Sequence, residues 1–559
     1  MIAVMGESTT TVGAVRLQFG VAYVVLLLIA ALPLMLTTYL PLYDYHNHLA
    51  RMHILLQDGD DPLLNQFYRT NWQVLPNLAM DVVVPWLAEL MPLEHAARLF
   101  TGLIFVLITT GTVALYAALH RELSWWPLLA FLFLYNRILL FGHLNYLAGV
   151  GLFLWTLAAW VHLRERPPLL CLAVFSVLAT VLFFAHLYAL GFYAIAIVGY
   201  ELGAAARRPG GMRELMRRSP VVLGQFLIPA YLFVFHSPTA EHAEIFSYFG
   251  PWWHFWNKVR AVHQVLVSYH GWFDRLTFVV LAAALVAALT LRWVELDRRM
   301  WLPLLLLLLV FLALPQALLG ALLVDFRLPA GIVFVVIASL RPGRIPCARA
   351  VAAALAALFV LRMGLVSERW YAADQVYDRY LEAIEGLPPG SKFVTATAQR
   401  PAPDEAFEPA LMYVNALAVI EKSGFEPMVF AIPGQQPIAV TEDYRLLASS
   451  HPWEWPAAPL EKLAPGLAGT RGVADPARRE GLLFEYDYLL LLYPHDASNP
   501  APALLDQLDV TPQFHLYRIR RPPQRRGSPL CPGEGRQVAR HRDCPEQYDD
   551  ASRRMAVPE

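Results

Sequence analysis

The segment after the first hydrophobic run is dense in titratable side chains. It reads Leu-Tyr-Asp-Tyr-His-Asn-His-Leu-Ala-Arg-Met-His from Leu42 to His53, and the preceding run, from about Val15 to Leu40, has no charge after Arg16. That run is long enough to cross the roughly 30 Å hydrocarbon core of a bilayer. We therefore expect Asp44 at the membrane surface, at the mouth of any cavity that the other helices form.

The spacing in this segment indicates how the side chains group. A helix that starts near Tyr45 can bring Asp44, His48 and Arg51 to one pocket. A partly desolvated carboxylate there, with imidazoles such as His46 alongside, can have a pKa suited to taking a proton from an acceptor hydroxyl. The alternative is an ordinary polar helix start, in which Asp44 is the N-cap and the histidines are solvated.

Ionisable side chains also occur near the ends of later hydrophobic runs, where they are costly and usually line a cavity. Arg137, His143 and His186 are such residues, and Leu-Val-Asp-Phe-Arg-Leu-Pro contains Asp325 and Arg327. Arg327 could bind a phosphate group. The alternative is a self-satisfied pair of Asp325 with Arg327 at a helix end.

Signatures of soluble enzymes and metal sites are absent from the sequence. It has no phosphate-binding glycine loop, no His-Glu-x-x-His and no Gly-x-Ser-x-Gly. The acidic run 58–61 superficially matches a sugar-nucleotide motif, but acidic residues around a glycine are more often a solvated turn. Of the four cysteines, Cys531 and Cys544 could pair if the tail lies outside the cytoplasm, or could stay as two thiols in a disordered segment.

The composition predicts a multi-pass membrane protein. Of the 559 residues, 57% are hydrophobic and only 16% charged, and the mean hydropathy is +0.43. The short arginine clusters lie between lipid-length runs and lack an aromatic stacking platform, so we expect no nucleic-acid partner. The first run has no cleavage site after it, which is typical of a retained signal anchor.

Runs of low charge predict about eleven membrane spans. Short loops rich in arginine stay cytoplasmic, and with a cytoplasmic N-terminus every basic cluster falls on one side, from Arg121 to Arg349. An odd number of spans then places the C-terminal third outside. The predicted spans are Val15–Leu40, Ala97–Leu119, Trp125–Leu140, Leu144–Val161, Leu169–Ala185, Leu187–Leu202, Val221–Phe235, Leu276–Leu291, Met300–Leu319, Ala321–Leu340 and Ala350–Val366.

Two outer loops are much longer than a connection needs. The first, 41–96, contains the proline-interrupted segment Pro76–Met91, which carries two acids and is predicted to lie along the interface as a helix. The second, 236–275, is rich in Trp and Phe and also holds Lys258. It is interpreted as an interfacial aromatic belt, or alternatively as a lid over a lipid chain or sugar ring.

The polar, proline-rich last third predicts a small α/β domain over 367–522. Helices are expected at Asp374–Glu385 and Ala410–Ser423, and strands at Lys392–Thr397, Tyr486–Tyr493 and Gln513–Ile519. The tail 523–559, with Pro, Gly and Arg throughout, is predicted to be disordered. Residues 1–366 form the predicted transmembrane domain, which shows no internal repeat.

This layout resembles the GT-C class of integral-membrane glycosyltransferases, in particular the bacterial lipid-carrier mannosyl- and arabinosyltransferase-like group. The resemblance covers the whole chain in outline, but its residue-level motif is only Asp44 with Tyr45 to Arg51. Many members have two adjacent acids in this loop, whereas Asp44 is followed by Tyr45. Asp81 is therefore a reserve candidate for the base.

The resemblance implies an inverting transfer of a sugar from a polyprenyl-phosphate donor to a hydroxyl of a glycan, lipid or protein acceptor, on the outer face of the bacterial inner membrane. Asp44 would be the catalytic base. No cofactor is expected, although some relatives need a divalent cation and the sequence has no dense carboxylate cluster to hold one. The alternative is a lipid-linked-sugar transporter, an assembly subunit or an inactive GT-C-like fold. The candidate substrate-binding residues are His46, His48, Arg51, Arg137, His143, His186, Lys258, Asp325 and Arg327.

Overall fold

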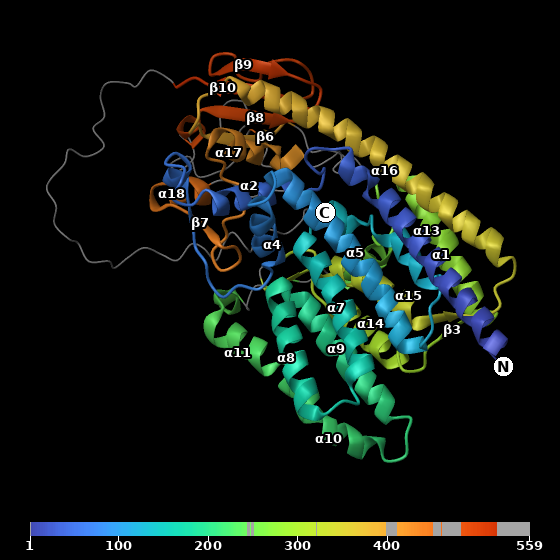
Figure 1. The fold of residues 1–559 in the computed structure, drawn as a ribbon. Helices are drawn as coiled ribbons and strands as arrows, with labels where there is room; N and C mark the ends of the chain where they lie inside the picture. The colour runs from blue at the N-terminus through green and yellow to red at the C-terminus, as the bar shows by residue number, and fades with distance from the viewer. Residues whose placement is uncertain are drawn as a thin grey trace. The chain divides into compact units, whose positions relative to one another are not determined.

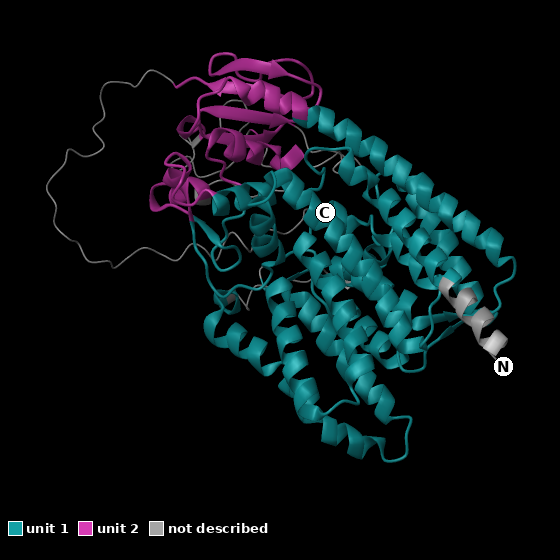
Figure 2. Ribbon diagram, viewed as in Figure 1, with its two compact units in different colours: residues 1–56, 70–377, 430–439 teal, residues 57–69, 378–429, 440–559 magenta. Residues whose placement is uncertain are grey.

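The computed structural model describes residues 2–242, 246–247, 251–319, 321–398, 411–450, 460 and 482–521. The chain divides into two compact units, coloured separately in Figure 2. The first comprises residues 1–56, 70–377 and 430–439, and the second comprises 57–69, 378–429 and 440–559. The predicted tail 523–559, with Cys531 and Cys544, lies outside the described residues.

The first unit is a bundle of helices (Figure 1). Within the described residues, eight helices or helix pairs are long and apolar enough to cross a membrane. These candidate spans agree in position with eight of the eleven predicted runs. They are Ala14–Met35 in α1 (Ile2–Met35), α5 (Leu93–His120), α7 (Leu144–Leu163), α8 (Pro168–Ala185), α9 (Leu187–Ala205), α10 with α11 (Gly211–Gly224 and Leu227–His236), α13 (Gly271–Thr290) and α16 (Ala348–Glu385).

The other three predicted spans are shorter helices. The run 125–140 forms a 3-10 helix, η1 (Trp126–Phe133), and the short α6 (Arg137–Leu140). The run 300–319 contains α14 (Trp301–Ala313), and the run 321–340 contains α15 (Val324–Ser339). At 1.5 Å per residue, α14 is only about 20 Å long. Apolar runs of this length also form buried helices, so composition alone does not separate the two.

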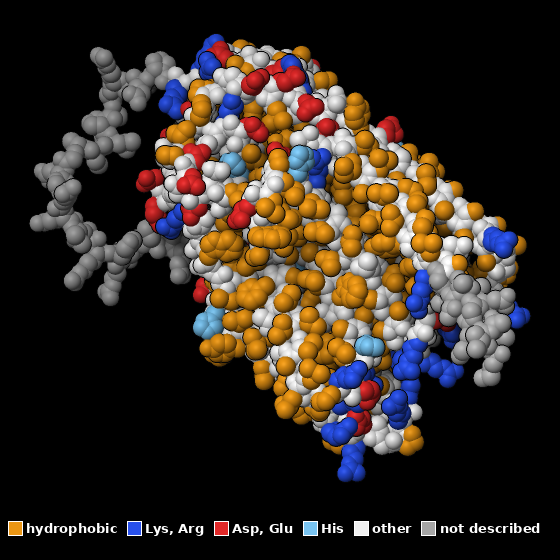
Figure 3. Space-filling view, in the orientation of Figure 1, with side chains coloured by type: hydrophobic (Ala, Val, Ile, Leu, Met, Phe, Trp, Pro, Cys, Tyr) orange, Lys and Arg blue, Asp and Glu red, His pale blue; other side chains and the backbone are white. Residues whose placement is uncertain are grey.

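The arginine-rich loops gather at one end of the bundle. Strand β3 (Val294–Leu296) pairs with β5 (Leu340–Pro342), and Arg299 donates to the carbonyl oxygen of Leu119. In the same region Arg164 Nη2 lies 2.8 Å from Glu201 Oε2. Figure 3 shows Lys and Arg side chains near α10 and a broad hydrophobic surface along the helices. The basic clusters thus lie at one end of the bundle, as they must if all of them face the same side of the membrane. That this side is the cytoplasm stays a prediction.

The Asp44 loop lies at the opposite helix ends. It contains α2 (Tyr45–Leu56) and α4 (Ala79–Ala88). Ten residues give α4 about half the length that a span requires. The Leu78 N–H donates to the Phe184 carbonyl oxygen at 2.6 Å, which fixes the start of α4 beside the end of α8. The bundle therefore separates the Asp44 loop from the arginine-rich loops.

Small residues allow the central helices to approach closely. A Cβ on Gly151 would lie 2.6 Å from Leu107 Cβ, and one on Gly111 would lie 2.9 Å from Leu154 Cβ. Close packing of this kind is the main source of helix association in lipid, where the hydrophobic effect between helices is lost. As Figure 1 shows, α5 and α7 lie side by side, and α9 and α14 continue the layer.

The second predicted outer loop, 236–275, forms η2 (Pro238–His242), β2 (Phe246–Ser247) and α12 (Pro251–His263), with β2 pairing antiparallel to β4 (Ala317–Leu318). The side chains of residues 242–253 lie outside the described ones. Phe255 and Trp256 are exposed, as expected for an interfacial belt.

The second unit contains a four-stranded mixed sheet in the order β6-β8-β10-β9. Strand β6 (Phe393–Thr397) is parallel to β8 (Tyr488–Leu492), whereas β10 (Phe514–Ile519) is antiparallel to both β8 and β9 (Leu505–Val510). Every residue of β6 and β8 is buried. The remaining elements are α3 (Leu64–Phe67), η3 (Leu411–Ala416), α17 (Leu417–Lys422), α18 (Glu442–Ser450) and η4 (Leu482–Glu485). Strand β1 (Tyr68–Thr70) pairs with β7 (Ile438–Val440).

The predicted boundary at 366 differs from the observed division. Helix α16 continues without a break through 367–373 to Glu385, and residues from Asp378 belong to the second unit. The stretch after Val366 has neither Pro nor Gly, so nothing in it stops a helix. Residues 57–69 of the first predicted loop also belong to the second unit, and 430–439 belong to the first.

Candidate functional site

Backbone hydrogen bonds hold Asp44 at the start of α2. Its N–H donates to the Phe141 carbonyl oxygen at 3.1 Å, and the preceding Tyr43 N–H donates to Leu140 O at 2.8 Å. The His48 N–H in turn donates to Asp44 O at 2.9 Å, as the first helical bond of α2. The chain after α6 therefore sets the position of the carboxylate.

Gly142 allows this close approach. Its φ is +84°, in the left-handed region, and a Cβ there would lie 3.0 Å from the Asp44 backbone nitrogen. His48 Nε2 also lies 3.1 Å from the Gly142 carbonyl oxygen. Only a residue without a side chain fits here without strain.

The Asp44 carboxylate is mostly buried but lacks a hydrogen-bond donor among the described residues. Its side chain is 15% exposed, and Oδ2 lies 3.7 Å from His143 Nδ1. Burial raises the pKa of Asp44 to about 7, against the opposing charges of Arg327 and Arg51. A carboxylate with this pKa can both accept and release a proton at neutral pH.

Three histidines lie in the surroundings of Asp44: His143 is 3.7 Å from its carboxylate, and His48 and His186 act electrostatically on His143. Burial lowers the pKa of His48, His143 and His186, so their imidazoles are neutral at pH 7. Within the described part of the chain, His48 Nδ1 and His143 Nε2 have no hydrogen-bond partner. His186 Nδ1 accepts from the Tyr188 N–H at 3.2 Å.

Arg327 supplies the permanent positive charge of this group. Its charge lowers the pKa values of Asp44, His143 and His186. Nη2 donates to the Leu322 carbonyl oxygen at 2.9 Å, and the guanidinium lies 5.6 Å from the Tyr188 ring centroid. Its Nε is buried and has no hydrogen-bond partner among the described residues. We call Asp44, His48, His143, His186 and Arg327 the Asp44 group.

Arg51 is committed to another carboxylate. Its Nε donates to Asp81 Oδ1 at 2.6 Å and its Nη2 to Asp81 Oδ2 at 3.1 Å, with both side chains buried. Asn145 extends this pair, since its Nδ2 lies 3.5 Å from Asp81 Oδ2 and its Oδ1 accepts from the Met80 N–H. The reserve assignment of Asp81 as a base does not fit, because Arg51 occupies both of its oxygens.

Asp325 does not pair with Arg327, contrary to the alternative from the sequence. Lys258 Nζ lies 3.2 Å from Asp325 Oδ2 and 2.7 Å from the Leu314 carbonyl oxygen. Residues two apart on a helix point about 200° apart, so the two side chains leave α15 on opposite faces. Lys258 is therefore committed to Asp325 and not to the Asp44 group.

Two other candidates from the sequence lie elsewhere. His46 is fully buried, its ring 4.5 Å from that of Tyr377 and edge-on to it, and its two ring nitrogens have no partners among the described residues. Burial lowers its pKa to about 3, so it packs as a neutral ring. Arg137 begins α6, where its N–H donates to the Gln264 carbonyl oxygen at 3.1 Å. Neither has a contact with Asp44 in the described structure.

Sequence analysis missed a buried pair, Asp274 with Arg362. The two side chains are 2.9 Å apart and fully buried between α13 and α16. A single arginine inside a predicted span, Ala350–Val366, was a usable signal, since such a charge needs a partner.

No group of three or more His, Cys, Asp or Glu residues is arranged to hold a metal in the described ranges. The acidic run 58–61 forms a turn, in which Asp61 Oδ1 accepts from the Leu63 N–H at 2.9 Å.

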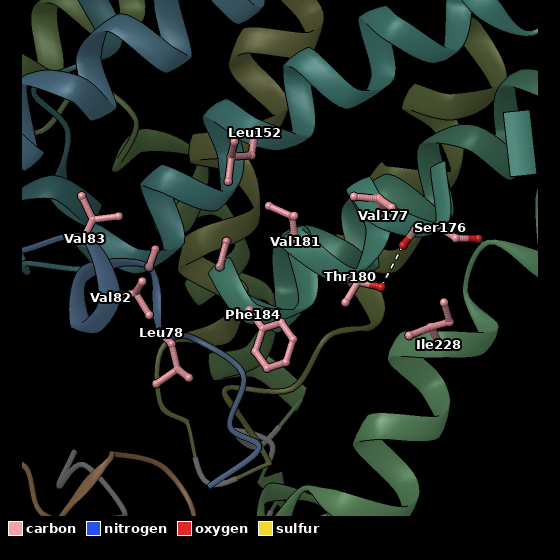
Figure 4. A pocket seen from close by; sticks show the side chains of 12 residues that line it. Leu78, Val82, Val83, Leu152, Ser176, Val177, Thr180, Val181, Phe184 and Ile228 are labelled. Carbon is pink, nitrogen blue, oxygen red and sulfur yellow. Dashed lines mark hydrogen bonds between the residues drawn. The ribbon is translucent and has the colours of Figure 1, made fainter. Parts of the chain in front are cut away.

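The first unit also contains an apolar groove of about 530 Å³ (Figure 4). It runs between α4 and α8, with Leu152 of α7 and Ile228 of α11 at its sides. Ala185, in its wall, directly precedes His186. The other lining residues are Leu78, Ala79, Val82, Val83, Ser176, Val177, Thr180, Val181 and Phe184.

No protein-family model matches this chain, and no curated protein matches it. Among solved structures it is similar to the arabinofuranosyltransferase AftD from mycobacteria, determined by cryo-electron microscopy, with a TM-score of 0.46 and 15% sequence identity. The match covers 90% of this chain and 40% of that chain, so this chain spans less than half of the length of AftD.

Proposed function

We propose that this membrane protein is an inverting GT-C-type glycosyltransferase that takes a sugar from a polyprenyl-phosphate donor, with Asp44 as the general base. The observation that carries the proposal is the Asp44 carboxylate, mostly buried and without a hydrogen-bond donor among the described residues, with a pKa of about 7. A base acts best when its pKa lies near the working pH. Structural carboxylates in the same chain, such as Asp81, have their oxygens occupied.

Arg327 fits the departing phosphate. Arg51 and Lys258 are both committed to carboxylates, so of the cations considered from the sequence Arg327 is the one placed in the Asp44 group. Its charge offsets the negative charge that grows on the leaving oxygen. The neutral imidazoles of His143 and His186 can donate hydrogen bonds to sugar or phosphate oxygens without adding charge.

The apolar groove fits the lipid tail of such a donor. All its described walls are apolar except for Ser176 and Thr180, and the Thr180 hydroxyl donates to the Ser176 carbonyl oxygen within α8 (Figure 4). Because Ala185 adjoins His186, a chain in the groove would carry its phosphate to the Asp44 group. A polar solute would gain nothing from these walls.

In the proposed reaction, the acceptor hydroxyl gives its proton to Asp44 as its oxygen forms a bond to the anomeric carbon. The bond from that carbon to the phosphate oxygen breaks with its electron pair, and polyprenyl phosphate leaves beside Arg327. Attack from the opposite side inverts the anomeric centre. The acceptor is a glycan, lipid or protein hydroxyl.

The proposed setting is the outer face of an inner membrane, with the N-terminus cytoplasmic and the second unit periplasmic. The separation of the arginine-rich loops from the Asp44 loop supports this orientation by the positive-inside rule. Polyprenyl-linked donors, unlike sugar nucleotides, can serve that face.

The test is transfer or hydrolysis by purified protein in detergent, with a panel of polyprenyl-phosphate sugars. We expect Asp44→Asn to lower kcat by about 10²–10⁴-fold while the donor KM changes little. The matched control is Asp60→Asn, which removes an exposed carboxylate from the same loop. Equal rates for wild type and Asp44→Asn would remove Asp44 from the mechanism, and no turnover of any donor by wild type would favour a transporter, assembly subunit or inactive fold.

A further inference from the structure

A second group of cations lies at the same end of the bundle, at the junction of α6, α12 and α13. The Arg137 N–H donates to Gln264 O, which joins α6 to the end of α12. Burial lowers the pKa of the His263 imidazole most, the Asp274 charge raises it, and the charges of Arg275, Arg137 and Arg260 lower it further. None of these residues is among the charges that act on Asp44. The two groups are therefore distinct, and we call this one the rim cluster.

The carboxylate nearest to the rim cluster is already neutralised. Asp274 accepts from the Ser268 N–H at 2.7 Å, from Ser268 Oγ and from Arg362 Nη1 at 2.9 Å each. Arg260 and Arg275 are exposed and have no carboxylate partner within the described residues. The cluster thus has an excess of positive charge, to which the N-terminus of α13 adds its partial charge.

An aromatic side chain and an apolar strip mark the depth of this cluster in a membrane. The Arg275 guanidinium lies 5.6 Å from the ring centroid of Trp272, which is 84% exposed at the first turn of a candidate span. Tryptophan is enriched at headgroup level. One turn and two turns further along α13, Leu276 and Val280 are 63% and 55% exposed, which gives an apolar surface directly below the arginines.

We propose that Arg260 and Arg275, with Arg137 and His263 beside them, bind the phosphate headgroup of an anionic membrane phospholipid whose acyl chains lie along α13. The guanidinium forks match phosphate oxygens in geometry and charge. Positive side chains at this level attract anionic lipids. The exposed strip of α13 distinguishes a lipid from a free anion, because only a lipid can cover it.

Such a lipid would support α6. This short helix begins at Arg137 and ends at Leu140, whose carbonyl oxygen holds Tyr43, and the next residue, Phe141, holds Asp44. Binding at the rim cluster would restrain both carbonyl groups. The lipid site itself does not depend on the proposed glycosyl transfer, and its test measures binding alone.

The test is native mass spectrometry of the full-length detergent-purified protein, titrated with phosphatidylglycerol or phosphatidylcholine, and with phosphatidylglycerol plus inorganic phosphate. The variant is Arg260→Gln with Arg275→Gln. The matched control is Arg344→Gln with Arg349→Gln, which removes two exposed arginines at the opposite end. Thermal unfolding of both variants checks that they are folded.

We expect phosphatidylglycerol to bind wild type and the control at least tenfold more tightly than Arg260→Gln/Arg275→Gln. Phosphatidylcholine should bind all three alike and more weakly than phosphatidylglycerol binds wild type, and inorganic phosphate should not displace the lipid. Unchanged phosphatidylglycerol binding by the rim variant overturns the proposal, as does an equal loss in the control. Displacement by inorganic phosphate at stoichiometric levels would show a free-anion site instead and would also overturn it.

Discussion

Two buried aspartates at the same end of the bundle differ in how their charge is compensated. Asp274 is fully buried, and its carboxylate accepts from Ser268 and Arg362. Asp44 is also mostly buried, but no described residue donates a hydrogen bond to its carboxylate, and the neutral His143 imidazole lies 3.7 Å from its Oδ2. The first arrangement suits a structural carboxylate, and the second leaves room for a proton or an acceptor hydroxyl.

The comparison shows that burial alone does not mark a reactive group. Arg51 with Asp81, and Lys258 with Asp325, are buried as deeply as Asp44 and are paired within the described structure. Arg51 donates to both oxygens of Asp81, and Lys258 donates to Oδ2 of Asp325. Asp44 stands apart because burial raises its pKa and no hydrogen bond stabilises its charge.

The largest expected effect is on stability, and it falls on the paired aspartate. Asp274→Asn leaves Arg362 as an uncompensated buried charge, so the free energy of unfolding should fall by about 3–5 kcal/mol. Asp44→Asn removes no hydrogen bond of the carboxylate, so it should not destabilise the fold. Thermal unfolding in detergent measures both. A stable Asp274→Asn protein, or an unstable Asp44→Asn protein, would break the contrast.

The second effect is a pH dependence of the transfer rate. Because Asp44 must be deprotonated to act as a base and its pKa is about 7, kcat/KM should rise with pH and level off above about 8. At pH 5 the rate should be about a hundredfold below the plateau, since a single group titrates. Burial lowers the pKa values of the histidines in the Asp44 group, so they titrate at lower pH than Asp44.

The raised pKa of Asp44 also makes the stability of the fold depend on pH. The folded state holds the Asp44 proton more tightly than the unfolded state, whose pKa is near 3.8. The contribution of this group is fully present below pH 3.8 and is lost as pH rises through about 7. Wild type should therefore lose thermal stability relative to Asp44→Asn between pH 5 and 8, and parallel curves for the two proteins would contradict the assignment.

The sequence predicted the membrane spans better than it predicted which charged side chains form ion pairs. Eight of the predicted uncharged runs coincide with candidate spans of the structure. They could be found from the sequence because a helix must have a minimum apolar length to cross the bilayer. The run 125–140 fails as one helix because half of it forms a 3-10 turn before α6. Local spacing placed Arg51 with Asp44, yet Asp81, thirty residues later, takes its guanidinium. Partners from distant segments cannot be read from spacing.

The residues of the candidate site also divide into those that local spacing could group and those that only the fold brings together. Asp44 and His48 are one helical turn apart, so the sequence could relate them. His143, His186 and Arg327 come from the starts of three other helices, and only the packing of α7, α9 and α15 brings them near Asp44. The separation of Asp325 from Arg327 was predictable, because residues two apart on a helix point to opposite faces.

A smaller effect is expected from Arg327→Gln, which removes the permanent charge of the Asp44 group. We expect kcat to fall about 10- to 100-fold, because the departing phosphate loses its cation. The midpoint of the pH profile should also move upward, since Arg327 lowers the pKa of Asp44. Arg344→Gln, an exposed arginine at the other end, is the control and should change neither quantity. A slower variant with an unmoved midpoint would place Arg327 away from Asp44.

The smallest expected effect comes from Gly142→Ala, which tests whether the loop positions Asp44. Alanine at φ +84° costs about 1–2 kcal/mol, and its Cβ would lie 3.0 Å from the Asp44 nitrogen. Because the Asp44 backbone must shift, kcat should fall several-fold although no group of the site is removed. Gly20→Ala is the matched control, since a Cβ there meets nothing within 4 Å and alanine favours the helix. If both variants have the wild-type rate, the backbone of this loop does not set the position of the base, and the difference between Asp44 and Asp274 must come from their side-chain surroundings alone.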